Sequence, residues 1–524
     1  MSDTVIQRVL FRAQPSTAAL YFQLASPAGP VPRASVAPDP RTLVLPAGST
    51  LHTCTYFNGL FEGHWRRSTQ VGDLSLHLVV SGHATVGLRR RSAQGSDQLL
   101  DSLDVDGDGC AIELRVPSAA DDVEESILYF TVEAFSSVTV QDGAWVAHGT
   151  DPRPVQLAVG FCTFNREAPL LRNLGALQDD PDLVEHLQRI IVVDQGSNRV
   201  RLHPGFAGVE NASVPVRLVE QGNFGGSGGF TRCILEASAM PRVTHMILMD
   251  DDAVVEPEGV FRCAAFLALA RQELAIAGQM LDLTRPTQLV EAGGTVCPKL
   301  LSLTTPAPTG LALQYSDELV QLTSHRPLDY GSWFSFAFPL ALVDRLGLPM
   351  PLFIRGDDAE FGCRMTTAGV PIVTVPGIAV WHHPWYARER GWYIYYNIRN
   401  TLILSAAHFA TSRWARFVSN LRLIIMSLLV RHYYTAWLNV EAMRAYTRGP
   451  RILACNPRSN HQRLLEAGRK LAAATLPRSQ VLSQLQPPPP PRTRLGRMWL
   501  LFKSVVGNLL WRSPAPNSPP PTSI

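Results

Sequence analysis

Apolar and polar positions alternate along the first part of the chain. Between about residues 42 and 146, turn residues separate short runs of this kind: 74–80, 84–88, 111–116 and 127–134. A period of two places every second side chain on the same face of a strand, as an antiparallel sandwich requires. The pattern therefore predicts an N-terminal β-sandwich over residues 1–150.

One acidic segment in this region, residues 104–109, resembles the start of a calcium-binding loop. Such a loop needs a bidentate glutamate at its twelfth position, where this chain has Arg115, and a helix on each side, for which there is no pattern. We therefore expect a solvated turn here.

The pattern changes at residue 155. Near-continuous apolar runs now alternate with helical segments and end in polar residues, at 155–164, 189–193 and 245–249. Strands buried on both faces and alternating with helices form a parallel sheet, which predicts an α/β domain over residues 151–397. Ligands bind beyond the carboxyl ends of such strands, so the polar residues there are expected along one edge: Arg166, Asp194, Gln195, Asp250, Asp251 and Asp252.

After residue 397 the pattern is helical, and arginines interrupt its apolar stretches, which predicts a helical domain over residues 398–483. A Pro-rich run, 487–491, lies in a tail over residues 484–524. The tail also holds an amphipathic segment, 494–512, with three aromatic residues: Trp499, Phe502 and Trp511. We interpret this segment as an interfacial membrane helix. Docking on its own domain or on a sister subunit is the alternative.

Composition adds a gradient of charge. The chain of 524 residues is 46% hydrophobic with a net charge of only +3, but residues 386–524 carry 20 Lys and Arg against 3 Asp and Glu. The other residues carry 27 against 41. A basic end of this kind favours a lipid surface or a nucleotide as its partner, rather than a nucleic acid.

Several targeting signals are missing from the sequence. No uncharged apolar stretch reaches the roughly 18 residues that span a bilayer, and the N-terminus lacks the pattern of a secretion signal. Eight scattered cysteines without CxxC spacing argue against a disulfide framework or a cysteine-based zinc site. We therefore expect a cytoplasmic protein that lies peripherally at the inner face of the cell membrane.

Three adjacent acids, Asp250, Asp251 and Asp252, end the third apolar run. Adjacent carboxylates repel one another, and a fold tolerates them at a strand end mainly where a cation offsets their charge. Alternate residues of an extended segment point the same way, so Asp250 and Asp252 can face one divalent ion while Asp251 turns toward sugar or protein. A solvated acidic turn is the alternative.

Two further motifs follow in order. Asp357 and Asp358 offer one group to orient a hydroxyl and another to take its proton, and His382 offers a neutral nitrogen to a metal. Taken singly, the acids are equally well explained as a helix cap and the histidine as a buried structural residue. Their order behind the acidic triplet favours one shared site.

These motifs together resemble glycosyltransferase family 2, and within it the bacterial polymerising galactofuranosyltransferases of the mycobacterial arabinogalactan type. The segments that carry the resemblance lie between about residues 40 and 480, at 56–59, 163–166, 194–196, 222–232, 249–252, 291–294, 333–334, 357–362, 381–382 and 397–400. The resemblance implies a GT-A (Rossmann-like) catalytic domain, with an N-terminal β-sandwich and a C-terminal helical region. It also implies an inverting, metal-dependent transfer from a UDP-linked sugar to a glycan or glycolipid acceptor.

The resemblance also assigns roles to residues. Asp358 is the implied catalytic base, and Asp250, Asp252 and His382 are the implied ligands of Mn²⁺ or Mg²⁺. The implied donor-binding residues are Arg166, Gln195, Asn223, Asp250 and Asp251. The implied acceptor-binding residues are Trp333, Phe334 and Asp357. The glycines of residues 222–229 let backbone approach the donor, or else form a flexible turn into a helix over residues 230–240.

Two departures from the family pattern leave the donor sugar open. Phe334 stands where the family has a second tryptophan, and Asn397 where it has a histidine. The favoured hypothesis is transfer of galactofuranose from UDP-galactofuranose. The alternatives are another family 2 sugar, such as rhamnose or a hexose for O-antigen or capsule, and an inert glycan-binding assembly protein. A homo-oligomer is compatible with each.

Overall fold

The computed structural model of the chain describes residues 2–26, 35–36, 39–117, 125–297, 302–306, 308–384, 391–454 and 457–472. Contacts divide the chain into two units, of which the first extends to His382 and the second begins at His383. This division lies before residue 397, where the sequence pattern placed the end of the catalytic domain. The Pro-rich run and the amphipathic segment 494–512 lie outside the described residues.

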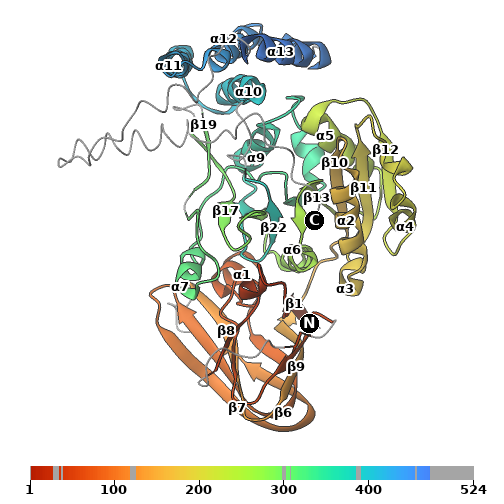
Figure 1. The fold of residues 1–524 in the computed structure, drawn as a ribbon, viewed down its shortest axis with the longest axis vertical. Coiled ribbons are helices and arrows are strands. Elements are labelled where there is room, and N and C mark those ends of the chain that lie inside the picture. Colours follow the sequence, from red (N-terminus) through yellow and green to blue (C-terminus); the bar gives the residue numbers. More distant parts are fainter. Residues whose placement is uncertain are drawn as a thin grey trace, which may run out of the picture. The chain divides into compact units, whose positions relative to one another are not determined.

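The N-terminal part of the first unit is a nine-stranded antiparallel sheet (Figure 1). Its strands are β1 (Ser2–Arg8), β2 (Gln23–Ala25), β3 (Ser35–Val36), β4 (Thr42–Leu45), β5 (Thr50–His52), β6 (Leu74–Ser92), β7 (Asp97–Arg115), β8 (Ser126–Ala134) and β9 (Val138–Thr150). The long β6 pairs with β9 along its first half, with β8 along its second half and with β7 along its length. The β-sandwich predicted over residues 1–150 is confirmed as a sheet-rich region, whose nine strands are joined in one continuous hydrogen-bonded sheet.

The prediction of a turn at residues 104–109 is wrong. These residues lie inside β7, and Asp104 accepts a hydrogen bond of 2.6 Å from the Thr85 hydroxyl of β6. The register shifts between Val80 and Gly82 of β6, opposite a Gly109 with φ of 60°. The glycines therefore allow a bulge within a paired strand instead of a turn.

The catalytic part is built on a seven-stranded sheet in the order β12-β11-β10-β13-β20-β15-β21. Its strands are β10 (Leu157–Thr163), β11 (Leu187–Asp194), β12 (Val216–Glu220), β13 (His245–Asp250), β15 (Ala275–Ala277), β20 (Phe336–Pro339) and β21 (Ile372–Val373). The first four strands are parallel, as the apolar runs predicted, whereas β20 is antiparallel to β13. The predicted α/β class is confirmed.

Helices cover both faces of this sheet. Helices α2 (Glu167–Gln178) and α6 (Pro257–Leu269) share a core with Phe161 and Ile247. Helices α5 (Gly225–Ser238) and α9 (Asp357–Thr367) share the opposite core with alternate residues of the same strands, such as Ala158 and Leu248. Alternating side chains of buried strands thus supply two separate cores.

A second, four-stranded sheet stands beside the first, in the order β14-β22-β16-β17. It consists of β14 (Val254–Val255), β16 (Gln279–Asp282), β17 (Leu289–Ala292) and β22 (Ala379–His382). Antiparallel pairing sets Val254 of β14 opposite Trp381 of β22. Because β14 follows the acidic triplet and His382 follows Trp381, this pairing brings the histidine to the acids.

Shorter elements complete the first unit: η1 (Ala18–Leu20), α1 (Glu62–Ser68), α3 (Pro181–Val184), η2 (Val200–Leu202), α4 (Phe206–Glu210), β18 (Thr295–Cys297), β19 (Ser302–Thr304), α7 (Ser316–Leu319), η3 (Val320–Leu322) and α8 (Leu342–Leu346). Helices α3 and α6 begin alike, since an acidic N-cap precedes a proline at the first helical position. This combination is favourable because proline there loses no hydrogen bond.

Buried ion pairs join the N-terminal sheet to the catalytic part. Arg8 of β1 contacts Glu258 of α6 at 2.6 Å and Asp180 at 2.7 Å, with its side chain 6% exposed. Arg12 contacts Glu256 at 2.6 Å, and one hydrophobic cluster contains side chains from both parts. The sheet and the catalytic part therefore form one packed body.

The second unit is helical, as predicted. It contains α10 (Tyr393–His408), α11 (Arg413–Leu429), α12 (Tyr433–Thr447), η5 (Gly449–Ala454) and α13 (Pro457–Ala472), with α12 in contact with the other three α-helices. Asn397 lies exposed on α10. Among the described helices, none combines the length and apolar content needed to cross a bilayer.

Candidate active site

The acidic triplet lies where the central strand β13 ends. Met249 is buried in the core, whereas the next side chain, Asp250, is 37% exposed. The turn that follows is held by Asn173 of α2, which donates to the Ala253 carbonyl at 2.7 Å and accepts from the Val255 amide at 3.3 Å. The acids are thus fixed at the edge where parallel sheets bind ligands.

Two of these acids and His382 form a candidate metal centre. His382 Nε2 lies 3.1 Å from Asp252 Oδ1 and 3.6 Å from Asp250 Oδ2, and one ligand atom from each residue lies within 4.8 Å of the others. Two carboxylates and one neutral imidazole suit Mn²⁺ or Mg²⁺, because carboxylate oxygens are the ligands these ions favour. The donor set therefore fits the cation that the family resemblance implied.

Arg166, the N-cap residue of α2 in the loop after β10, contributes a cation to this group. Its guanidinium pairs with Asp252 and lies 3.8 Å from Asp251 Oδ1, and its side chain is 45% exposed. Asp251 is buried, and this burial raises its pKa to about 6, while Thr163 and Arg166 act in the opposite direction. An arginine in this position is suited to turn toward the anionic oxygens of a ligand.

Asp357 and Asp358 open helix α9 after a strained loop. Phe353 and Arg355 have φ of 71° and 69°, a region that residues other than glycine seldom adopt. Asp358 Oδ1 accepts from the Ala359 amide at 2.8 Å. Burial first, and then the charge of neighbouring acids including Asp250, raises the pKa of both carboxyls. The acid pair and the triplet therefore share one electrostatic neighbourhood.

Glu291 belongs to the same neighbourhood, and from sequence it was placed in a segment of family resemblance without being given a role. Its carboxylate is 7% exposed and accepts from the Ser332 hydroxyl at 2.5 Å. Burial raises its pKa to about 7, and the charge of Asp358 adds to this shift. The signal was the segment Glu291-Ala292-Gly293-Gly294. Gly294 packs so closely on Tyr330 that an added Cβ would lie 2.1 Å from the ring.

Gln195 and Asn223 hold the loop that enters α5. Gln195 donates to the Gly225 carbonyl at 2.9 Å and accepts from the Phe224 amide at 2.7 Å, while Asn223 accepts from the Gly225 amide at 2.9 Å. Both ends of the Gln195 amide are therefore engaged within the protein. A direct donor contact from either residue stays a prediction.

The glycine-rich segment is not a flexible turn, and that alternative is wrong. Its glycines from Gly225 onward form the first turns of α5. A Cβ added at Gly225 would lie 2.0 Å from the Phe353 carbonyl, and one at Gly229 would lie 2.0 Å from Cys162 Sγ. These glycines let helix α5 pack closely against Phe353 and Cys162.

Trp333 and Phe334 are both buried. Trp333 lies edge-on to Phe230 at 5.3 Å and to Phe361 at 6.4 Å. Phe334 stacks on the His382 ring at 6.2 Å. These contacts support the core and the candidate metal ligand, and acceptor binding by the two rings stays a prediction.

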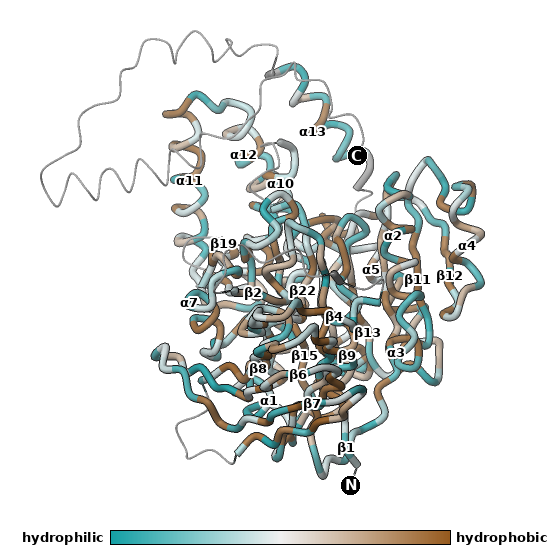
Figure 2. Tube along the Cα trace, turned by 60° about the horizontal axis from the view of Figure 1, so that its bottom comes forward, coloured by the Kyte–Doolittle hydropathy of each residue, from teal (hydrophilic) through white to brown (hydrophobic). Residues whose placement is uncertain are grey.

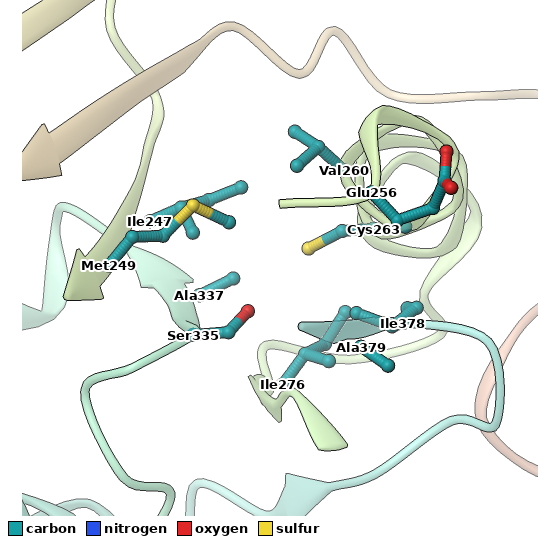
Figure 3. A pocket seen from close by; sticks show the side chains of 11 residues that line it. Ile247, Met249, Glu256, Val260, Cys263, Ile276, Ser335, Ala337, Ile378 and Ala379 are labelled. Carbon is teal, nitrogen blue, oxygen red and sulfur yellow. The ribbon is translucent and has the colours of Figure 1, made fainter. Parts of the chain in front are cut away.

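A small cavity lies behind β13, between this strand and α6 (Figure 3). Its lining includes Met249, Cys263 and Ser335, and its volume of about 10 Å³ is that of about one water molecule. It is too small for a nucleotide sugar.

Comparison with known proteins agrees with this geometry. Residues 6–148 match the family described as Galactofuranosyltransferase 2 N-terminal, and residues 152–400 match Glycosyltransferase like family 2. The chain is 30% identical over 437 residues to galactofuranosyltransferase GlfT2 of Mycolicibacterium smegmatis and of Mycobacterium tuberculosis. These matches cover 80% of this chain and 67% and 68% of the two relatives.

Solved structures give a weaker match. A mannosyltransferase from Pyrobaculum calidifontis, in complex with GDP-mannose and Mn²⁺, is 14% identical with a TM-score of 0.34, over 69% of this chain and 90% of that one. The fold and the matched families define a glycosyltransferase of family 2 with a GT-A-like catalytic domain. Within that class, the chain belongs to the family of the GlfT2 galactofuranosyltransferases.

Proposed function

We propose that this glycosyltransferase moves galactofuranose from UDP-galactofuranose to a lipid-linked or cell-surface glycan, with inversion at the anomeric carbon. The main support is the 30% identity to curated galactofuranosyltransferases, joined to the gathering of Asp250, Asp252 and His382 at one strand edge. A cation held by these three residues, Mn²⁺ or Mg²⁺, would neutralise the charge of the departing diphosphate.

Asp358 is the proposed general base. Its carboxylate takes the proton of the acceptor hydroxyl while the hydroxyl oxygen bonds to the anomeric carbon and the bond from that carbon to the diphosphate breaks. Burial raises its pKa, which makes it a stronger base than an exposed aspartate. Asp357, next to it, orients the acceptor, with Trp333 and Phe334 shaping the acceptor side.

The donor is bound from the other side of the acids. Arg166, whose guanidinium is exposed enough to leave Asp252, binds the diphosphate, and Asp250, Asp251 and Asn223 line the nucleotide and sugar. Gln195 acts through its hydrogen bonds to the loop before α5.

A panel of nucleotide sugars tests the proposal. With Mn²⁺ and a galactofuranosyl-terminated acceptor, UDP-galactofuranose is expected to be consumed, and UDP-galactopyranose, UDP-glucose and a rhamnose donor are not. Asp358→Asn should lower turnover about 10³-fold while UDP binding persists. Asp344→Asn, which changes an exposed aspartate of α8, is the control. Preference for another donor refutes the sugar assignment, and an active Asp358→Asn refutes the base.

Association with a membrane surface is a second proposal, and it rests on α11. Hydropathy alternates along this helix (Figure 2), and its apolar side chains are exposed, among them Trp414 at 71%, Leu429 at 72% and Ile425 at 47%. Arg413 and Arg422 add positive charge beside them. An apolar stripe with flanking cations suits an anionic lipid surface, where the acceptor would be anchored.

Vesicle sedimentation tests this proposal. Binding to anionic vesicles should fall with added salt and with the double substitution of Trp414 and Leu429 by Ala. Leu202→Ala, which removes an equally exposed leucine, at 75%, from the first unit, should change nothing. If the double variant instead only lowers the oligomeric state, the stripe is an interface between copies.

A further inference from the structure

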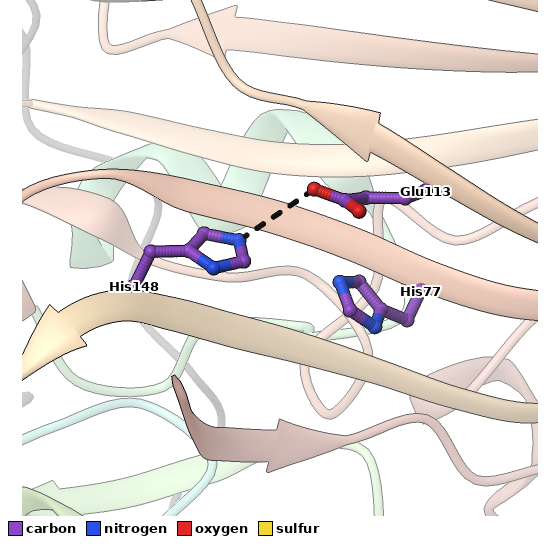
Figure 4. A group of neighbouring side chains, drawn as sticks. All are labelled: His77, Glu113 and His148. Atoms are coloured by element: carbon purple, nitrogen blue, oxygen red, sulfur yellow. Dashed lines mark ion pairs between the residues drawn. The ribbon is translucent and has the colours of Figure 1, made fainter. Parts of the chain in front are cut away.

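A second group of candidate metal ligands lies in the N-terminal sheet. His77 is on β6, Glu113 on β7 and His148 on β9, and β6 pairs with both of the other strands. One ligand atom from each residue lies within 4.8 Å of the others. Figure 4 shows the carboxylate and the two imidazole rings gathered on one side of these strands.

Strand register creates this group. His77 is paired directly with Glu113 and lies opposite Ala144 of β9, four residues before His148. Leu76 and Leu78 point into the core, so His77 lies on the other face of the sheet. His77 Nε2 is buried and has no hydrogen-bond partner within the described part of the chain. A buried ring nitrogen of this kind needs a partner, and a metal ion would be one.

The orientation of the His148 ring also suits metal ligation, because a contact with Asp3 holds it. Its Nδ1 lies 3.0 Å from Asp3 Oδ1 of β1. An imidazole that donates one N–H to a carboxylate keeps the lone pair of its other nitrogen for a metal, as is usual for histidine ligands. That other nitrogen, Nε2, lies 2.7 Å from Ser75 Oγ and 3.9 Å from Glu113 Oε1.

One cation competes for the carboxylate. Arg115 Nε donates to Glu113 Oε1 at 2.9 Å. The Arg115 side chain is 78% exposed, so it is free to turn into solvent when a metal takes the carboxylate. The arginine therefore lowers the affinity of the group without occupying its centre.

We propose that His77, Glu113 and His148 form a second metal site, which takes a transition-metal dication of the Zn²⁺ type. Two imidazoles and one carboxylate are a common zinc ligand set, with water as the fourth ligand. Mn²⁺ and Mg²⁺ prefer sites richer in oxygen, so the two groups of the molecule select different ions. A metal here joins β6, β7 and β9 and, through Asp3, fixes the N-terminal strand β1.

Cobalt titration tests the site directly. The full chain, without a histidine tag and stripped with a chelator, carries Asp252→Asn to weaken the other group. Co²⁺ should bind with one equivalent, give the visible absorption of a low-coordinate site, and be displaced by Zn²⁺. His77→Gln and His148→Gln should each weaken binding at least tenfold. His83→Gln, also on β6 but beside Phe135, is the matched control.

Two further variants move the affinity in opposite directions. Arg115→Gln should strengthen Co²⁺ binding because it removes the competing cation, and Asp3→Asn should weaken it about tenfold because it frees the His148 ring. In the chain with Asp252 restored, His77→Gln should keep full Mn²⁺-dependent turnover, which shows that the variant folds and separates this site from the transferase proposal. Equal Co²⁺ binding by all variants, or none by the parent chain, overturns the proposal.

Discussion

The two candidate metal groups of this enzyme differ in how their charge is balanced. Asp250, Asp252 and His382 lie at the edge of a parallel sheet, with Glu291 and the α9 acid pair in the same electrostatic neighbourhood. His77, Glu113 and His148 lie on an antiparallel sheet, with an arginine paired to the one carboxylate. In the first group Arg166 pairs with one acid among several, so negative charge remains for a cation to offset, whereas in the second group Arg115 already pairs with the one carboxylate among the three residues.

This difference has a thermodynamic consequence. Buried carboxyls whose pKa is raised oppose folding at neutral pH, because the folded state disfavours their ionised form. The active site therefore holds a charge arrangement that lowers stability until substrate and cation bind. In a site of this kind, the charges that serve the reaction also lower the free energy of unfolding.

Removing one acid of the first group should have the largest effect. Asp252→Asn is expected to lower Mn²⁺-dependent turnover by about 10³-fold, because it takes away a ligand that also contacts His382 and Arg166. Steady-state consumption of the donor measures it. Glu113→Gln, the equivalent change in the second group, should stay within twofold of the parent. Comparable losses of turnover in Asp252→Asn and Glu113→Gln would show that the two groups do not differ in this way.

Neutralising Glu291 should stabilise the protein only at high pH. Its folded pKa of about 7 lies above the ordinary value, so its favourable contribution is full at acid pH and is lost as pH rises through 7. Without metal, Glu291→Gln should therefore gain about 2 kcal/mol at pH 8, and much less at pH 5. Urea unfolding at both values measures this, with Glu185→Gln, an exposed glutamate, as the control. An equal gain at both pH values would disprove the electrostatic cause.

Loosening a histidine ligand should have the smallest effect. Phe334→Ala removes the ring stacked on His382 and should raise the Mn²⁺ concentration for half-maximal turnover about tenfold. Phe135→Ala removes a ring at 5.0 Å from His83, outside both groups, and is the matched control. Unchanged Mn²⁺ dependence would show that Phe334 does not position the ligand.

Much of the first group could be predicted from sequence. Acids that end an apolar run lie at the carboxyl edge of a parallel sheet, and that placement needs only local pattern. The approach of His382 depends on the pairing of β14 with β22, which no local pattern specifies. The engaged amide of Gln195 and the buried ring of Trp333 depend likewise on contacts distant in the chain.

The second group was beyond sequence reasoning. His77, Glu113 and His148 meet only in one register of three strands, and a slip by one residue would turn Glu113 to the other face. The prediction of a turn at residues 104–109 was wrong for a related reason. Their acids and glycines are typical of a turn, but pairing along the whole of β6 keeps them in a strand.

The ion pairs of Arg8, Arg12 and Arg41 tie the stability of the catalytic part to the first 150 residues. Cutting the chain there would take three guanidinium groups from four acids: Glu256, Glu258, Asp180 and Asp182. Stranding even one buried charge costs about 3–5 kcal/mol, a large share of what keeps a domain folded. We therefore expect residues 151–382, expressed without the N-terminal sheet, to fold less stably than the complete first unit.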